Sequence, residues 1–389
     1  MLTGDNGILT RAGEAKEKTD ITQIDEQRRL ATMVAATNLT ETEFQGVKIP
    51  AGFAPTMIEG ESTKEEGLVI TDSTGNEFVW IEVPNDGTGP NYSNVEKNAE
   101  GKVEFTEENY TAIKNALISY AGFPEGSDMN TTRKNWKDVW YDSNWNNEGD
   151  NPNDTEGCGL TLAEYKQLYK KMLESIYTNG GFWIGRYETG IKGSESAPTG
   201  VRNSTQNNEI LSTDGDIPVI KANVQSYTWV RCSQAQRLAS NMNSGNYSSS
   251  LMFGLQWDLV IKYLQANGTE ENALKENSTS WGNYQDTLYN ITDIQASYST
   301  DSGATWLKAP YNKMVNGMTL LTTGANEEFK KQNIYDLAGN VFEFTLEYAS
   351  SGAHTKCALR GGCSGIRGIY GTASNRFVPS TMSSAVYRF

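Results

Sequence analysis

Residues 334–345, with the sequence IYDLAGNVFEFT, constrain the fold of this chain more than any other segment. The run from Asp336 to Asn340 is typical of a tight turn, because glycine and asparagine adopt backbone conformations that other residues avoid. The run leads into residues 341–344, whose alternating side chains predict a strand. Further on, Gly361 and Gly362 allow another segment of backbone to approach closely. We therefore expect one strand that begins at a tight turn and a second that ends where two backbones meet.

Helical periodicity is confined to the first two thirds of the chain, and short strands lie on either side of it. The clearest helix begins at a capping box of Thr161 and Glu164 and ends at Gly180. A second box, Ser233 with Gln236, is expected to start another helix. Short strands are expected at 47–50, 68–70 and 77–83, the last two joined by a turn over 73–76. The expected helices cover residues 8–37, 106–120, 161–179, 233–242 and 255–266. This order predicts an α+β fold rather than a regular βαβ series.

The charge of the chain excludes one large class of partner. There are 48 acidic and 33 basic residues, and the net charge is −15. A nucleic-acid-binding protein needs a basic patch that offsets such a field, and no cluster of lysine and arginine provides one. The single histidine, His354, excludes a zinc site built from several histidines. No window approaches the ~18 apolar residues that a membrane-spanning helix needs.

The cysteines, Cys158, Cys232, Cys357 and Cys363, lack the C-x-x-C spacing of metal sites. Cys357 and Cys363 can form a disulfide if their Cα atoms lie within ~7 Å. The alternative is that all of the cysteines are ordinary buried thiols. His354 lies just before Cys357, which is too close in sequence for the usual catalytic Cys–His pair.

A loop over residues 142–154 gathers asparagine and aspartate side chains, whose oxygens are the ligands that calcium prefers. Its spacing is not that of an EF-hand loop. A solvated turn region is the alternative, because these residues favour turns. We expect no cofactor beyond, at most, a structural calcium ion in this loop.

The N-terminal region combines an amphipathic helix with a distinctive leader. Apolar or small residues recur at helical spacing on one stripe, at Ile21, Ile24, Ala31 and Ala35, with Arg28 among them. The preceding residues 2–12, LTGDNGILTRA, resemble the segment directly after the membrane helix in type IV pilin-like proteins of Gram-positive bacteria. The resemblance implies that residues 1–40 are a pilin-like helix whose membrane anchor has been removed upstream. It also implies a bacterial cell-surface or pilus-associated, extracellular protein, with other pilin subunits as candidate partners and membrane contact only through that missing helix.

Four separated segments together resemble one family, the C-type lectin-like fold of the formylglycine-generating enzyme superfamily. They are residues 181–188 (GFWIGRYE), 226–235, 334–345, and 359–362 together with 373–376. The resemblance implies that residues 41–389 form one C-type lectin-like domain with long insertions, which follows the N-terminal helix.

The superfamily has an enzyme branch and a binding branch. The enzyme branch uses a pair of copper-binding cysteines, one of them shortly before the stretch that here is 373–376. This chain has Gly371 and Thr372 there, and Cys363 is displaced by several residues. Because glycine and threonine cannot replace a thiolate on a soft metal, we expect a non-enzymatic protein. A copper oxidase or sulfatase-modifying enzyme remains the alternative, and a structural pilus or phage-fibre subunit is a second one.

The binding branch includes proteins diversified by retroelements, in which the stretch from a Gly-Gly pair to a terminal Gly-Phe-Arg carries variable residues. Here Gly361-Gly362 opens such a stretch and Val386-Tyr387-Arg388 stands at its end. The resemblance implies a ligand surface over about 361–389. Its mixture of apolar, aromatic, arginine and small residues is typical of a paratope. The candidate ligand-binding residues are Ser364, Ile366, Arg367, Ile369, Tyr370, Phe377, Val378, Thr381, Met382, Ser383, Ser384 and Val386.

The alternative for this stretch is an ordinary C-terminal loop and strand, with Ile366, Ile369 and Val378 packed inside. The expected ligand is a protein or a glycan on another cell, a phage or a host surface. The Glu-Pro-Asn and Gln-Pro-Asp triplets of calcium-dependent sugar-binding lectins are absent from the sequence, which favours a protein.

Overall fold

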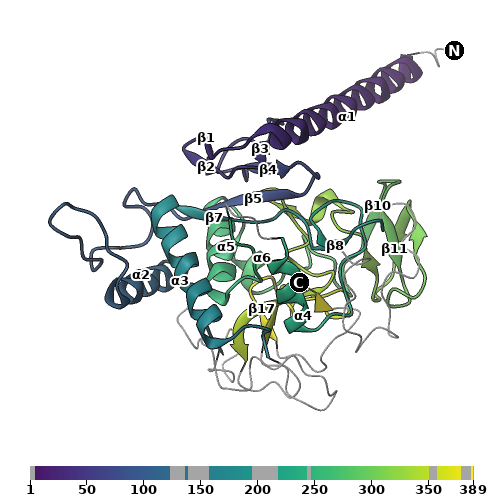
Figure 1. Cartoon of the computed structure of the whole chain (residues 1–389). Helices are drawn as coiled ribbons and strands as arrows, with labels where there is room; N and C mark the ends of the chain where they lie inside the picture. The colour runs from purple at the N-terminus through teal and green to yellow at the C-terminus, as the bar shows by residue number, and fades with distance from the viewer. Residues whose placement is uncertain are drawn as a thin grey trace.

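A computed structural model of the chain describes residues 5–122, 136–138, 157–194, 218–242, 247–349, 357–377 and 387–388. Within these ranges the protein has a mixed α+β structure that begins with a long helix, as Figure 1 shows. The α+β class expected from the sequence is confirmed. Among the described residues, no helix is both long enough and apolar enough to cross a membrane.

The helices begin and end close to the predicted positions. Of the two predicted capping boxes, one is present and the other is not. Thr161 and Glu164 form the predicted capping box of the third helix, and Gly180 ends it in a left-handed conformation. The fourth helix begins before the predicted box: the backbone N–H of Arg231 donates to Gln234, so the prediction of a Ser233–Gln236 box was wrong. In the described chain the helices are α1 (Asp5–Thr37), α2 (Glu107–Ala121), α3 (Leu162–Asn179), α4 (Cys232–Ser240), α5 (Gly254–Ala266) and α6 (Glu271–Lys275), with a 3₁₀ turn, η2, at Glu327–Phe329.

Two larger sheets form the frame of the molecule. The first is antiparallel, with strand order β3-β4-β5-β7, and it contains the predicted hairpin between β4 and β5. The second has the order β19-β18-β17-β20, in which β20 runs parallel to β17 and β6 also pairs with β17. The strands of the first sheet are β3 (Phe53–Pro55), β4 (Val69–Asp72), β5 (Glu77–Glu82) and β7 (Gly181–Gly185). Those of the second are β6 (Trp136–Lys137), β17 (Phe342–Ala349), β18 (Cys357–Arg360), β19 (Arg376–Phe377) and β20 (Tyr387–Arg388).

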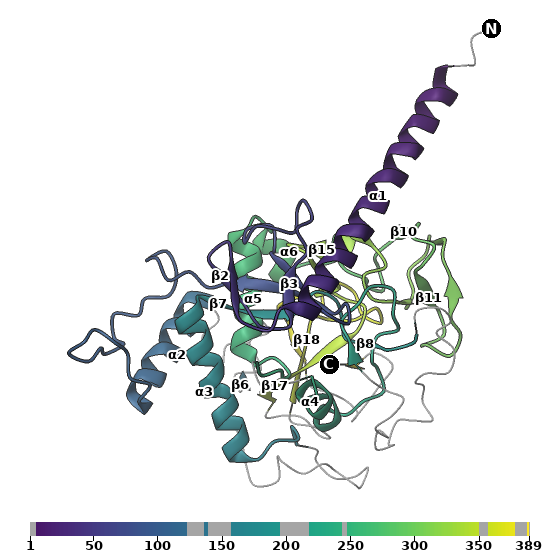
Figure 2. The ribbon, with the colours of Figure 1, turned by 45° about the horizontal axis from the view of Figure 1, so that its top comes forward.

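Smaller antiparallel ladders complete the described strands. The ladders of β10 to β14 lie on the opposite side of the molecule from α2 and α3 (Figures 1 and 2). The pairs are β1 (Thr42–Phe44) with β2 (Val47–Ile49), β8 (Gly190–Ile191) with β9 (Pro218–Val219), β10 (Tyr289–Ile291) with β13 (Tyr311–Lys313), and β15 (Lys330–Lys331) with β16 (Ile334–Tyr335). The strand β11 (Ser297–Ser299) lies between β12 (Leu307–Lys308) and β14 (Leu320–Leu321).

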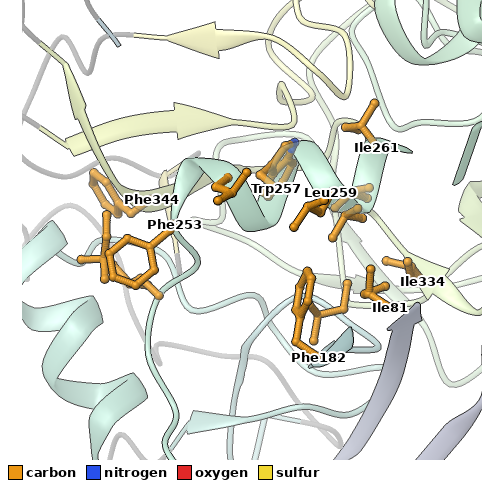
Figure 3. Close-up of a cluster of buried hydrophobic side chains, with 14 of the residues drawn as sticks. Ile81, Phe182, Phe253, Trp257, Leu259, Ile261, Ile334 and Phe344 are labelled. Carbon is orange, nitrogen blue, oxygen red and sulfur yellow. The ribbon is translucent and has the colours of Figure 1, made fainter. Parts of the chain in front are cut away.

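The main hydrophobic core surrounds α5. Trp257 and Ile261 of α5 are completely buried, between apolar side chains of the first sheet and of β17. Figure 3 shows Ile81 and Phe182 of the first sheet on one side of the helix. Phe344 of β17 lies near Phe253, the residue just before the helix begins. The indole N–H of Trp257 donates to the carbonyl of Ala373 at 2.9 Å, so α5 also fixes the loop that precedes β19.

The predicted tight turn before β17 joins two of the segments on which the family resemblance depends. Gly339 and Asn340 both have left-handed backbones, with φ of 84° and 51°. The Asn340 amide donates to the buried carboxylate of Glu188 at 2.6 Å and accepts from the backbone of Leu321 at 3.0 Å. A Cβ on Gly339 would lie 2.4 Å from the Asn283 carbonyl oxygen, so this position needs glycine.

Helix α1 projects from the body, and only its last turns pack against β3 and β4 (Figure 2). Ala31 and Ala35 of the predicted stripe are buried there. Ile21 is 54% exposed, because this earlier part of the helix lies beyond the edge of the body. Arg28 forms ion pairs with Glu61, at 2.6 Å, and with Glu77. Arg186 of the body pairs with the same two carboxylates, at 2.8 and 3.0 Å, so a charge cluster fixes the end of α1.

One disulfide joins two cysteines that are far apart in the sequence. Cys232 at the start of α4 forms a disulfide with Cys357 of β18, with Cα atoms 6.6 Å apart. Cys158 and Cys363 are buried thiols. Cys357 therefore does not pair with Cys363, which the sequence left open, and the alternative that all four cysteines are thiols was wrong.

Candidate functional site

The predicted ligand surface begins in the loop between β18 and β19, residues 361–375. Gly361 and Gly362 open it, each with φ of 82°. A Cβ on Gly361 would lie 2.3 Å from a carboxylate oxygen of Glu343, and one on Gly362 would lie 2.1 Å from the Gly371 carbonyl oxygen. The glycine pair thus permits the close approach expected from the sequence, and it brings the two ends of the loop together.

A buried network of four charges lies under this loop and joins the strands on both sides of it. Asp258 of α5 accepts from Arg360 at 2.7 Å and from Arg376 at 2.6 Å. Glu347 of β17 accepts from the same arginines, at 3.3 and 2.8 Å. All four residues are at most 9% exposed. Two positive and two negative charges balance, so the network ties β18 and β19 to α5 and β17 without a net buried charge.

The tip of the loop is fixed by hydrogen bonds to residues 278–286. The backbone N–H of Gln285 donates to the Ile366 carbonyl at 2.8 Å, and that of Ser278 donates to the Gly368 carbonyl at 3.2 Å. The backbone N–H of Gly368 in turn donates to the side chain of Asp286 at 3.1 Å. The loop therefore has a defined conformation at the positions that were predicted to contact a ligand.

The predicted site residues that the structure describes are exposed, half-buried or, in one case, fully buried. Arg367, Ile369 and Tyr370 are exposed, and Tyr370 reaches 63%. Ile366 and Phe377 are half-buried against the main core. The phenylalanine ring lies 4.6 Å, between centroids, from that of Phe342.

Ser364 differs from the expectation. Its exposed fraction is 0%, and its backbone N–H donates to the Asn340 carbonyl at 2.9 Å. It lies beneath the surface because the loop has not yet turned outward after the glycine pair, so it cannot touch a ligand there. The other predicted residues, Val378, Thr381, Met382, Ser383, Ser384 and Val386, lie outside the described residues.

Three exposed apolar residues that sequence reasoning did not single out belong to the segments around β10 and β13. Leu288 is 56% exposed, Met314 is 70% exposed and Val315 is 74% exposed. They flank the end of the β10–β13 ladder, in which Tyr289 is in register with Lys313. Gln285 connects this region to the loop, since its carbonyl accepts from Gly317 at 2.9 Å while its N–H donates to Ile366. In the sequence, Met314 and Val315 are an apolar pair among polar residues. A pair this short has no periodicity, so the sequence does not show whether it lies on the surface or in the core.

The possible cofactor and catalytic groups are only partly within the described chain. The candidate calcium loop, 142–154, and His354 lie outside the described residues. Among the residues that the structure describes, no group of three or more histidine, cysteine or acidic side chains is arranged to hold a metal ion. Burial raises the pKa of the Cys363 thiol to about 12, and Cys357 is in the disulfide. Neither cysteine therefore offers a thiolate at neutral pH.

Comparison with known proteins adds no relative. No model of a protein family matches the chain, and no curated protein matches it either.

Proposed function

We propose that this chain is a non-enzymatic recognition protein of the bacterial cell surface, which binds its ligand through the loop tip 366–370 on a C-type lectin-like scaffold. The observation that carries the proposal is that Arg367, Ile369 and Tyr370 are exposed on a loop whose backbone is hydrogen-bonded on both sides of them. Functional loops on a rigid scaffold are the usual arrangement of binding sites, because the contact residues then lose little conformational entropy on binding.

The composition of this surface favours a protein ligand. Tyrosine and arginine are the side chains most often found as binding hot spots. Leu288, Met314 and Val315 are further exposed apolar side chains, on segments that Gln285 links to the loop by backbone hydrogen bonds. A glycan would need more polar groups at the centre of the surface than these residues provide.

The enzymatic alternative has less support. A copper oxidase of this superfamily needs two adjacent thiolates, and the residues before 373–376 are glycine and threonine. The candidate Cys363 is a buried thiol with a raised pKa. Because these residues do not fit a copper site, we derive no reaction.

The test compares the full chain with a Tyr370→Ala, Ile369→Ala double variant against an array of purified bacterial surface proteins and phage particles. We expect at least one partner whose affinity falls about tenfold or more in the double variant, as the loss of two anchor side chains predicts. Leu39→Ala is the matched control, because Leu39 is 85% exposed outside this surface. A partner that binds the double variant and the wild-type chain equally would refute the site.

Retroelement diversification has a separate test in the genome. A neighbouring reverse transcriptase gene is expected, with a near-copy of the DNA for residues 361–389 that differs at adenines. An isolated gene without such a copy would make the chain a fixed relative rather than a diversified one.

A further inference from the structure

A groove of about 880 Å³ runs along β7, away from the loop tip 366–370. Its walls come from the first sheet, from α3 and from residues 247–253, and none of residues 366–370 lines it. Its volume lies within the range of ligand sites in proteins.

The strand β7 forms one edge of the first sheet among the described strands. Two backbone hydrogen bonds show which of its residues bond to β5. Val83 donates to the Gly180 carbonyl at 2.8 Å, and Arg186 donates to the Glu77 carbonyl at 3.0 Å. In an antiparallel pair, alternate residues bond to the neighbouring strand. The even-numbered residues of this segment therefore face β5, and Gly181, Trp183 and Gly185 direct their N–H and C=O groups away from it.

These outward groups have no hydrogen-bond partner within the described part of the chain. Trp183 and Gly185 both line the groove, so a row of unpaired backbone donors and acceptors borders it. Natural sheet edges are commonly protected by charged residues, proline or a bulge. The sequence of β7, Gly-Phe-Trp-Ile-Gly, has no charge and no proline.

Side chains of the groove suit an extended chain, whose own side chains alternate between two faces. On the outer face of the sheet, Trp183 lies in register with Trp80, with ring centroids 5.0 Å apart, and Phe78 and Tyr247 line the same groove. On the inner face, Phe182 lines the groove. Trp80 is 3% exposed, and its indole N–H has no partner among the described residues, so a polar group in this wall is unsatisfied.

We propose that β7 binds an extended peptide segment of a partner protein as an added strand. Backbone hydrogen bonds to the outward groups of Trp183 and Gly185, which line the groove, would give affinity, and apolar side chains against the tryptophan pair would give specificity. A peptide is favoured over a saccharide because the unpaired groups repeat at every second residue, which matches the backbone of a strand and not that of a sugar chain.

The test begins with the Tyr370→Ala, Ile369→Ala chain, so that the proposed recognition loop cannot select ligands. Random 12-residue peptides displayed on phage are enriched on this chain, and fluorescein-labelled synthetic copies are titrated by anisotropy. Each peptide is also made with N-methyl groups on the odd or on the even residues. A paired strand uses only alternate amides, so we expect one methylated series to weaken binding about tenfold or more and the other to change it little.

Two variants test whether the peptide binds to β7. Trp183→Pro removes the outward N–H as well as the indole, whereas Trp183→Ala removes only the indole, and proline is tolerated where an edge N–H faces away from the sheet. We expect Trp183→Pro to bind more weakly than Trp183→Ala. Equal binding by both methylated series, equal binding by the two variants, failure to enrich any peptide, or displacement of the peptides by linear hexasaccharides would each overturn the proposal. None of these results depends on the recognition loop.

Discussion

Substitution of Arg376 tests whether the buried charge network supports the recognition loop. Arg376→Met removes the bonds of 2.6 Å to Asp258 and 2.8 Å to Glu347 and keeps a long apolar side chain. Arg360 then remains as the one arginine of the network for two carboxylates, and its own bonds are 2.7 and 3.3 Å. A buried negative charge is left without compensation.

The expected cost follows from that uncompensated charge. Breaking a buried ion pair by removing one partner costs about 3–5 kcal/mol, whereas an exposed pair contributes about 1 kcal/mol or less. The matched control is Lys275→Met, because Lys275 pairs with the largely exposed Glu271 at 2.7 Å. The free energy of unfolding is measured by equilibrium urea denaturation with tryptophan fluorescence. The guanidinium of Arg360 lies 5.4 Å from the ring centroid of Trp257, so this signal reports on the network.

A loss of less than about 1 kcal/mol in Arg376→Met, comparable with the control, would refute the reasoning. It would mean that water or rearrangement compensates the two carboxylates. The strands on either side of the loop would then not depend on this network.

Three other perturbations have definite expected results. Burial, and then the nearby Glu347 carboxylate, raise the pKa of Asp138 to about 7, so the folded chain binds this proton more tightly than the unfolded chain. The proton on Asp138 contributes fully to stability below about pH 4, and this contribution is lost as the pH rises to about 7. The free energy of unfolding should therefore fall by roughly 2–3 kcal/mol from pH 5 to pH 8. Asp138→Asn should make the free energy of unfolding depend less on pH over this range. Reduction of the Cys232–Cys357 disulfide, which closes a separation of 125 residues, should lower the unfolding free energy by about 2–5 kcal/mol, and an unchanged melting temperature in reductant would contradict the pairing. Arg28→Ala should release the end of α1 and speed amide hydrogen exchange over residues 28–37, and unchanged exchange would show that the apolar contacts suffice.

The parts of the fold that sequence predicted are those with a local cause. The cap of α3 depends on Thr161 and Glu164, which are three residues apart, and the turn before β17 depends on Gly339 and Asn340. The start of α4 was misplaced because Ser233 and Gln236 match the capping-box pattern, whereas the actual cap is Arg231, a residue type that the pattern does not select.

The parts that sequence missed depend on distant contacts. The disulfide partner of Cys357 lies 125 residues away, and no spacing rule selects it. In the site, the exposure of Tyr370 and the burial of Ser364 differ although both belong to one irregular stretch, because the fold turns the chain outward only after residue 365. Leu288 and Met314 flank a strand ladder that has no periodic signal of its own.

The central claim is that the loop tip contacts the ligand, and hydroxyl-radical footprinting of the complex with an identified partner tests it most directly. We predict that oxidation of Tyr370 falls severalfold on binding, while oxidation of the exposed Leu39 at the end of α1 does not change. Protection elsewhere in the chain, with Tyr370 oxidised as fast in the complex as alone, would contradict the account.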